Sequence, residues 1–119
     1  GIQKGEKEKI AAQQLRNYQL FDAPVALYFT VNKAMGIGSK MDISMMIQNV
    51  MVAARARGLD TCPQAAWNPF HAIVLDVLQA PEDEELVCTV ALGYADPEHI
   101  VNTFVTPREP AENFTVFLD

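Results

Sequence analysis

The most apolar stretch of the chain is residues 40–57, which contain neither Pro nor Gly. It carries four of the chain's five Met residues, and its apolar side chains fall on nearly every face of a 3.6-residue helical wheel. This pattern predicts a buried helix. We expect Ser39 to cap its first turn and Gly58 to take the left-handed conformation that follows its end.

Two uncharged runs rich in β-branched residues predict strands at residues 25–31 and 86–94. Both are strongly apolar, so we expect them to lie side by side at the sheet centre, with both faces covered. A polar helix with a narrow apolar edge is predicted over residues 6–20, and a short apolar helix over residues 68–78. Residues 114–117 alternate like one short edge strand.

The apolar helix needs cover on more than one side, and a chain of 119 residues gives little material for that cover. Two interpretations of its Met residues remain open. They fill the core of a single chain, or they form the seam of a dimer. The predicted strand at residues 114–117 also favours a second subunit, because an apolar strand near a terminus needs another sheet edge to join.

Length and charge restrict the class of protein. One domain accounts for 119 residues, and the net charge of −6 disfavours a nucleic-acid partner. Polar and charged residues interrupt every apolar run before it reaches the length of a membrane span. The first ten residues alternate in charge and lack the apolar core of a secretory signal, so we expect a cytoplasmic protein that does not bind membranes.

Familiar catalytic and metal-binding motifs are missing from the sequence. Cys62 and Cys88 form no CxxC pair and have no His at metal-ligand spacing, so we interpret them as reduced thiols packed as small apolar groups. The acidic run at residues 81–85 is interpreted as a solvated connection. No catalytic residue and no metal site is therefore assigned.

Residues 58–67, GLDTCPQAAW, are the remaining candidate for a functional site. We expect a conformationally fixed loop whose small side chains expose backbone N–H groups beside Trp67. Such a loop can donate hydrogen bonds to the edge of a flat heteroaromatic ring. Many helix-to-strand connections have a similar composition, so a purely structural loop stays open as an alternative.

The order of the sequence blocks resembles a known family. The run MDISMMIQNVMVAARARGLDTCPQAAW, preceded by FDAPVALYFTV and followed by LVCTVALGYADP and TPREPAENFTVF, resembles the C-terminal half of FMN-dependent nitroreductases, from about residue 21 onward. The resemblance implies a partial α+β sandwich, with a central sheet and helices on both faces, that forms a homodimer. It divides this single domain into an N-terminal helix (1–20), a core (21–110) and a C-terminal arm reaching the partner subunit (111–119).

The same resemblance implies FMN as cofactor and assigns its contacts. Pro63, Gln64, Ala65 and Ala66 would lie along the isoalloxazine, with the Ala65 N–H facing N5 and the Ala66 N–H approaching O4. Arg108 would pair with the phosphate through its guanidinium.

Two features depart from the family pattern. Val105, Thr106 and Pro107 stand where relatives carry another basic residue before the arginine. Residues 1–20 also lack the Arg-rich, Ser-containing segment that holds the phosphate in longer relatives. We therefore expect either the C-terminal part of a longer enzyme or a naturally short version.

The implied activity is an FMN-dependent NAD(P)H oxidoreductase that reduces nitroaromatics, quinones or similar acceptors. The alternative is a truncated, non-catalytic module with a nitroreductase-like fold that serves only to dimerise or to carry flavin. Bound flavin and its reduction by NAD(P)H distinguish these interpretations.

Overall fold

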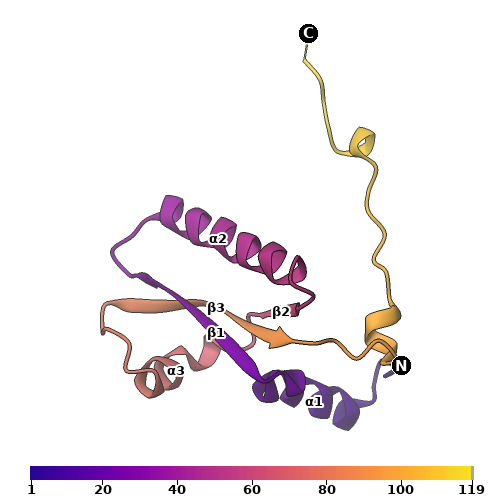
Figure 1. Cartoon of the computed structure of the whole chain (residues 1–119), viewed down its shortest axis with the longest axis horizontal. Helices are drawn as coiled ribbons and strands as arrows, with labels where there is room; N and C mark the ends of the chain where they lie inside the picture. Colours follow the sequence, from indigo (N-terminus) through magenta and orange to yellow (C-terminus); the bar gives the residue numbers. More distant parts are fainter. Residues whose placement is uncertain (119) are drawn as a thin grey trace.

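A computed structural model describes residues 1–118, and Asp119 lies outside the described residues. The sheet has three antiparallel strands in the order β1-β3-β2. Helix α2 covers one of its faces, and α1 and α3 lie on the other side (Figure 1). The α+β architecture with helices on both faces is thus confirmed. The elements are α1 (Lys7–Leu15), β1 (Val25–Asn32), α2 (Ile37–Arg55), β2 (Asp60–Gln64), α3 (His71–Val77) and β3 (Glu84–Gly93).

Strand β3 is the centre of the sheet because both other strands pair with it. The predicted pairing of the two apolar runs is confirmed, although β1 is an edge strand and not central. Val90 of β3 is fully buried, in keeping with its uncharged neighbours. At the end of β3, a Cβ added to Gly93 would lie 2.9 Å from Pro24 Cδ, so glycine is needed for the close approach of the chain before β1.

The bounds of α2 differ from the prediction at both ends, because the helix begins three residues earlier, at Ile37, and ends two residues earlier, at Arg55. Gly36 occupies the cap position without any side-chain cap, and Ser39 lies inside the first turn, so the predicted Ser39 cap is wrong. The extended backbone of Gly36 already turns the chain into the helix upstream of Ser39. After the helix, Gly58 has φ +75°, as predicted, and the Leu59 N–H donates to Ala54 O at 3.0 Å.

Helix α2 is buried on one side only, although its sequence is apolar on all sides. Only Ile47 and Ala54 are buried, and they face the sheet. The opposite side carries an outward stripe of exposed apolar side chains, formed by Ile37, Met41, Met45 and Val52. The predicted burial of the whole helix is wrong within one chain, and Met41 and Met45 do not fill its core.

The N-terminal helix ends earlier than predicted. After Leu15 the chain continues as the short 3-10 helix η1 (Arg16–Asp22), whose last three residues have positive φ values. An ion pair of 2.6 Å joins Arg16 to Asp22 across this turn. The chain must reverse here to enter β1, and the tight turn ends the regular helix.

The predicted helix at residues 68–78 is split in two. A 3-10 turn, η2 (Asn68–Phe70), precedes α3, and Val74 is the buried residue of α3. The predicted cap at Asn68 is wrong, because its side-chain amide donates instead to Val87 O of β3 at 3.0 Å.

Beyond β3 the chain leaves the body of the molecule (Figure 1). It forms the 3-10 turns η3 (Ile100–Thr103) and η4 (Ala111–Asn113), and no strand occurs between 95 and 118. The predicted strand at 114–117 is therefore wrong in the isolated chain. Phe114 and Phe117 are 70% and 86% exposed, so no sheet edge of the same chain receives them.

The isolated chain exposes more surface than a compact protein of its size. Its radius of gyration is 17.4 Å, against about 13.5 Å for a compact domain of this length. Its accessible surface is 9404 Å², against roughly 6,400 Å² for a folded monomer of this mass. The outward stripe of α2 and the segment after β3 contribute to the excess. Among the described residues, no helix combines the length and apolarity required to cross a bilayer.

Candidate functional site

The candidate segment at residues 58–67 is not a loop throughout, because Asp60–Gln64 form β2. This strand follows α2 directly and pairs in register with the end of β3. The prediction of a loop is therefore wrong for these five residues. It followed from Asp60 and Pro63, which are residues typical of turns. The segment nevertheless lies at an open edge of the sheet, because β2 is the last strand.

Pro63 determines which groups face that edge. It lies opposite Val90 of β3, and this pair cannot exchange two hydrogen bonds because proline has no N–H. The bonded pairs of the antiparallel ladder are therefore those of Cys62 and Gln64. Since the Gln64 carbonyl faces β3, the N–H of Ala65 in the same trans peptide points away from β3, toward the open edge.

The next peptide is oriented in a similar way. Ala65 O accepts a hydrogen bond from Asn68 N at 3.1 Å, so the opposite end of that peptide, the Ala66 N–H, is turned away from the bond. Ala66 O accepts from the Tyr18 hydroxyl at 3.3 Å. Within residues 1–118 neither alanine N–H donates a hydrogen bond. Two consecutive amides are thus free while the carbonyls of the same residues are occupied.

The side chain of Gln64 does not point toward the edge. It is 3% exposed, and its Nε2 donates to Asn17 O at 3.0 Å and to Asn17 Oδ1 at 3.1 Å. Gln64 can therefore adjoin a ligand at the edge through its backbone alone. Pro63, Ala65 and Ala66 leave a surface of small side chains beside the free amides.

Trp67 anchors the end of the segment. Its ring packs edge-on against Tyr18 at 5.3 Å and against Tyr28 at 6.0 Å between ring centroids. These contacts connect the segment to η1 and to β1. The contacts of Asn17 with Gln64 and of Tyr18 with Ala66 could not be predicted from sequence spacing, because the partners lie almost fifty positions apart. The one hint was the place of Tyr18 on the apolar edge of the predicted helix.

Arg108 lies apart from the other predicted site residues. It belongs to the segment that leaves the body of the molecule (Figure 1). Its Nη1 donates to Thr106 Oγ1 at 2.6 Å, to Thr106 O at 3.1 Å and to Pro107 O at 3.3 Å. Within one chain the structure therefore brings together Pro63, Gln64, Ala65 and Ala66, but not Arg108.

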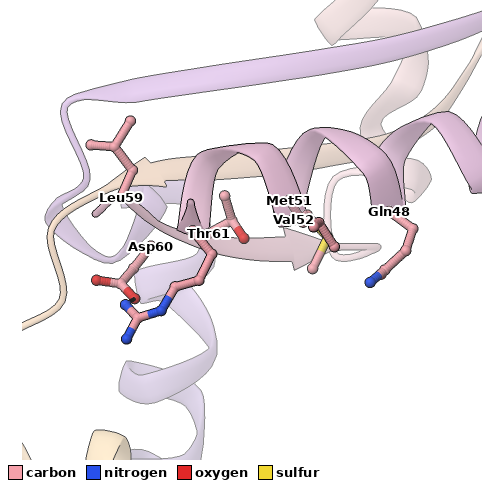
Figure 2. Close-up of a pocket in the computed structure, with 7 residues that line it drawn as sticks. Gln48, Met51, Val52, Leu59, Asp60 and Thr61 are labelled. Carbon is pink, nitrogen blue, oxygen red and sulfur yellow. Dashed lines mark hydrogen bonds and ion pairs between the residues drawn. The ribbon is translucent and has the colours of Figure 1, made fainter. Parts of the chain in front are cut away.

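A shallow groove borders β2 on the side of α2. Figure 2 shows residues from the last turns of the helix and the first residues of the strand around it, and an ion pair of 2.7 Å joins Arg55 to Asp60. The groove measures about 270 Å³, slightly below the roughly 300–1,000 Å³ of typical small-molecule sites. The groove borders the start of β2, and none of residues 63–66 lines it. The lining residues are Gln48, Met51, Val52, Arg55, Leu59, Asp60 and Thr61.

The cysteines are free thiols. Partial burial, and then the nearby Cys88, raise the pKa of the Cys62 thiol above its ordinary value. A thiol with a raised pKa is a poor nucleophile at neutral pH. In the part of the chain that the structure describes, no three His, Cys, Asp or Glu side chains gather as a metal site.

Comparison with known proteins shows similarity along most of the chain. The profile of the nitroreductase family matches residues 2–94, beginning earlier than the expected residue 21. The 4-nitrobenzoate reductase of Pseudomonas putida is 40% identical over 102 residues, covering 86% of this chain and 45% of the relative. The chloronitrobenzene nitroreductase of Comamonas testosteroni is 39% identical over 103 residues, covering 87% of this chain and 45% of the relative.

Solved structures give the same result. The FMN and NADPH-dependent nitroreductase NfnB from Sphigopyxis sp. strain HMH superposes with a TM-score of 0.96 at 33% identity. It covers 100% of this chain, which in turn covers 53% of that structure. The chain spans about half the length of the relatives that it matches. By sequence and by fold, this chain belongs to the nitroreductase family.

Proposed function

We propose that this chain acts in an FMN-dependent NAD(P)H oxidoreductase that reduces nitroaromatics, quinones or similar acceptors. The observation that carries the proposal is the pair of free amides at Ala65 and Ala66, whose carbonyls are occupied by other partners. Family membership supports it, because relatives at 39–40% identity are named as nitroreductases.

The free amides fit the chemistry of a flavin. An isoalloxazine ring is flat and carries hydrogen-bond acceptors along one edge, and two consecutive donors at a sheet edge can meet them. When bound, FMN supplies the electron-transfer chemistry. The Ala65 and Ala66 amides would donate to the ring and stabilise negative charge on it, while the small side chains of the segment allow the ring to approach the backbone.

The phosphate requires a separate residue, and Arg108 is the candidate. A guanidinium is suited to bidentate contact with a phosphate. Arg108 is exposed, and its hydrogen bonds reach only the neighbouring residues Thr106 and Pro107. Its guanidinium can therefore take another acceptor.

A homodimer accounts for the uncovered surface. We propose that the outward stripe of α2 packs against a second copy and that the segment after β3 extends onto it. The partner would then face the open edge of β2 beside the Ala65 and Ala66 amides, so that two FMN sites lie between the subunits. The observed surface exceeds the compact one by about 3,000 Å² per chain, or about 6,000 Å² for a pair, which is more than enough for the roughly 2,000–5,000 Å² in total that obligate dimers bury.

A second candidate function is a module that dimerises or carries flavin without turnover. It is favoured by the separation of Arg108 from the segment of β2 within one chain, which keeps the predicted phosphate contact away from the candidate ring contacts (Figure 1). Losing charge-assisted hydrogen bonds worth roughly 1.5–3 kcal/mol each weakens binding by orders of magnitude.

One series of measurements separates these functions. The chain is incubated with excess FMN, desalted, and its flavin absorbance recorded before and after anaerobic NADH or NADPH, followed by 4-nitrobenzoate. Oxidoreductase function requires retained flavin that the nicotinamide bleaches and the nitroaromatic restores. Retained flavin that stays oxidised identifies a carrier, and a dimer without flavin identifies a dimerisation module; both outcomes contradict the oxidoreductase.

A further inference from the structure

We propose that η1 clamps the segment that ends β2, with Asn17 and Tyr18 as positioning residues that keep the Ala65 and Ala66 amides directed outward. The inference rests on the proposed flavin function. It goes beyond that function because it assigns a role to the N-terminal turn, which belongs to none of the predicted flavin contacts. The clamp is defined here as the contacts of Asn17 with Gln64 and of Tyr18 with Ala66.

The first contact fixes the segment where it leaves the sheet. Gln64 Nε2 is held between two oxygens of one residue, Asn17 O at 3.0 Å and Asn17 Oδ1 at 3.1 Å. The side chain of Asn17 is itself fixed, because its Nδ2 donates to Gln14 O at 2.9 Å. Since Gln64 is 3% exposed, water has little access to compete for these bonds. Gln64 is therefore held from both sides, its backbone by β3 and its side chain by η1.

The second contact fixes the segment two residues later. The Tyr18 hydroxyl donates to Ala66 O at 3.3 Å, while its ring packs edge-on against Trp67 at 5.3 Å and Phe70 at 5.4 Å. Ala65 and the N–H of Ala66 lie between the two contacts. The orientation of these two amides depends on the contacts at Gln64 and at Ala66, so the loss of either contact allows the amides to rotate.

The turn that carries the clamp is strained. Leu20, Phe21 and Asp22 have φ values of 55°, 52° and 67°, which residues other than glycine rarely adopt. Such a conformation persists only when its surroundings hold it. Arg16 does so in two ways, through its ion pair with Asp22 at 2.6 Å and through its guanidinium 5.7 Å from the centre of the Phe21 ring. The turn thereby presents Asn17 and Tyr18 to the segment.

A fixed donor pair has a chemical consequence. Amides already oriented toward developing negative charge stabilise it without reorganisation during the reaction. We therefore expect the clamp to raise the preference of the site for reduced over oxidised flavin. A loosened segment would lower that preference and, even without flavin, would open the hydrogen bond from Asn68 N to Ala65 O.

Two substitutions test the clamp. Gln64→Met keeps the length of the side chain and removes its donors, and Tyr18→Phe removes the hydroxyl while keeping the ring contacts. Gln19→Leu is the matched control, because Gln19 lies in the same turn, is exposed, and makes no side-chain hydrogen bond within the described residues. The first readout is hydrogen exchange of the Asn68 amide, relative to that of Val90 in β3, in flavin-free protein.

We expect each clamp variant to raise this exchange ratio about tenfold and the control to leave it unchanged. In protein that retains FMN, a tenfold loss of preference for reduced flavin appears as a fall in midpoint potential of about 30 mV for a two-electron couple. Exchange ratios equal to wild type in both variants overturn the clamp, as does an unchanged potential. A wild-type chain that binds no FMN refutes the proposed function alone, because the exchange ratio is measured without flavin.

Discussion

Replacing Met45 with aspartate is expected to dissociate a pair of chains that packs through the outward stripe of α2. Met45 is 58% exposed in the isolated chain and faces away from the sheet, on the side opposite Ile47. The substitution therefore changes neither the core of the chain nor its contact with the sheet. Its effect should fall on association and not on folding.

The magnitude follows from the exposed fraction of the side chain. Full burial of a Met side chain contributes about 1.5–3 kcal/mol, so burying the 58% of Met45 that is exposed contributes about 1 to 2 kcal/mol per chain. A two-fold interface uses the residue twice, giving about 2 to 4 kcal/mol. This loss alone weakens dimerisation roughly 30- to 700-fold. Burying two carboxylates at the seam would weaken it further.

Sedimentation velocity across a range of protein concentrations measures the change in dissociation constant. Met35→Asp is the matched control, because Met35 is 50% exposed and lies in the connection before α2. Circular dichroism should show the same helix and strand content in both variants. The reasoning is refuted if the wild-type chain is monomeric at micromolar concentration, or if Met45→Asp dimerises as tightly as Met35→Asp.

Three further outcomes are expected. In a flavin fluorescence titration, Arg108→Ala should weaken FMN binding about 10- to 150-fold, because a charge-assisted contact is lost. An equal loss of affinity in the control Arg57→Ala would show that Arg108 does not contact the cofactor. Gly58→Ala should lower the free energy of unfolding in urea by about 1–2 kcal/mol because the φ of Gly58 is +75°; steric contact contributes nothing, since the added Cβ meets no atom within 4 Å. Gly38→Ala is equally unobstructed but lies inside α2, so it should raise the free energy of unfolding by about 0.5–1 kcal/mol. A loss of stability at both positions would contradict the conformational explanation. Because burial raises the pKa of Cys62, less thiolate is present at neutral pH than for free cysteine, and alkylation by iodoacetamide should be slower. The alkylation rate, assigned to this thiol by its loss in Cys62→Ser, should rise with pH around a midpoint more alkaline than that of free cysteine; a midpoint at or below that of free cysteine would refute this.

The strands of the sheet could be predicted from sequence because their signal is local. Uncharged, β-branched residues around Phe29 and Val90 favour strands in any surroundings, and Gly58 marks the end of α2 by its conformational freedom alone. The short strand β2 escaped prediction. Its five residues include Asp60 and Pro63, which are typical of turns, and its pairing is decided by β3, which lies more than twenty residues further along the chain.

Direction and distance in the chain limited the remaining predictions. A helix with apolar residues on every side does not reveal which side faces its own sheet, so the outward position of Met45 required the structure. In the candidate site, the free amides at Ala65 and Ala66 could be expected from the small side chains. The contact of Gln64 with Asn17 could not, because no periodicity connects residues 47 positions apart.

Pro63 also affects how chains meet when they are crowded. An outermost strand with a complete row of free donors and acceptors invites a strand of another molecule to add to it, which is how ordered aggregates begin. In the middle of β2 the proline offers no donor to such a strand, so the added ladder would be interrupted where it should be strongest. A small planar molecule needs only the two amides beyond the proline and is unaffected by this gap. One residue thereby disfavours the addition of a further strand at this border and leaves the two amides beyond it free.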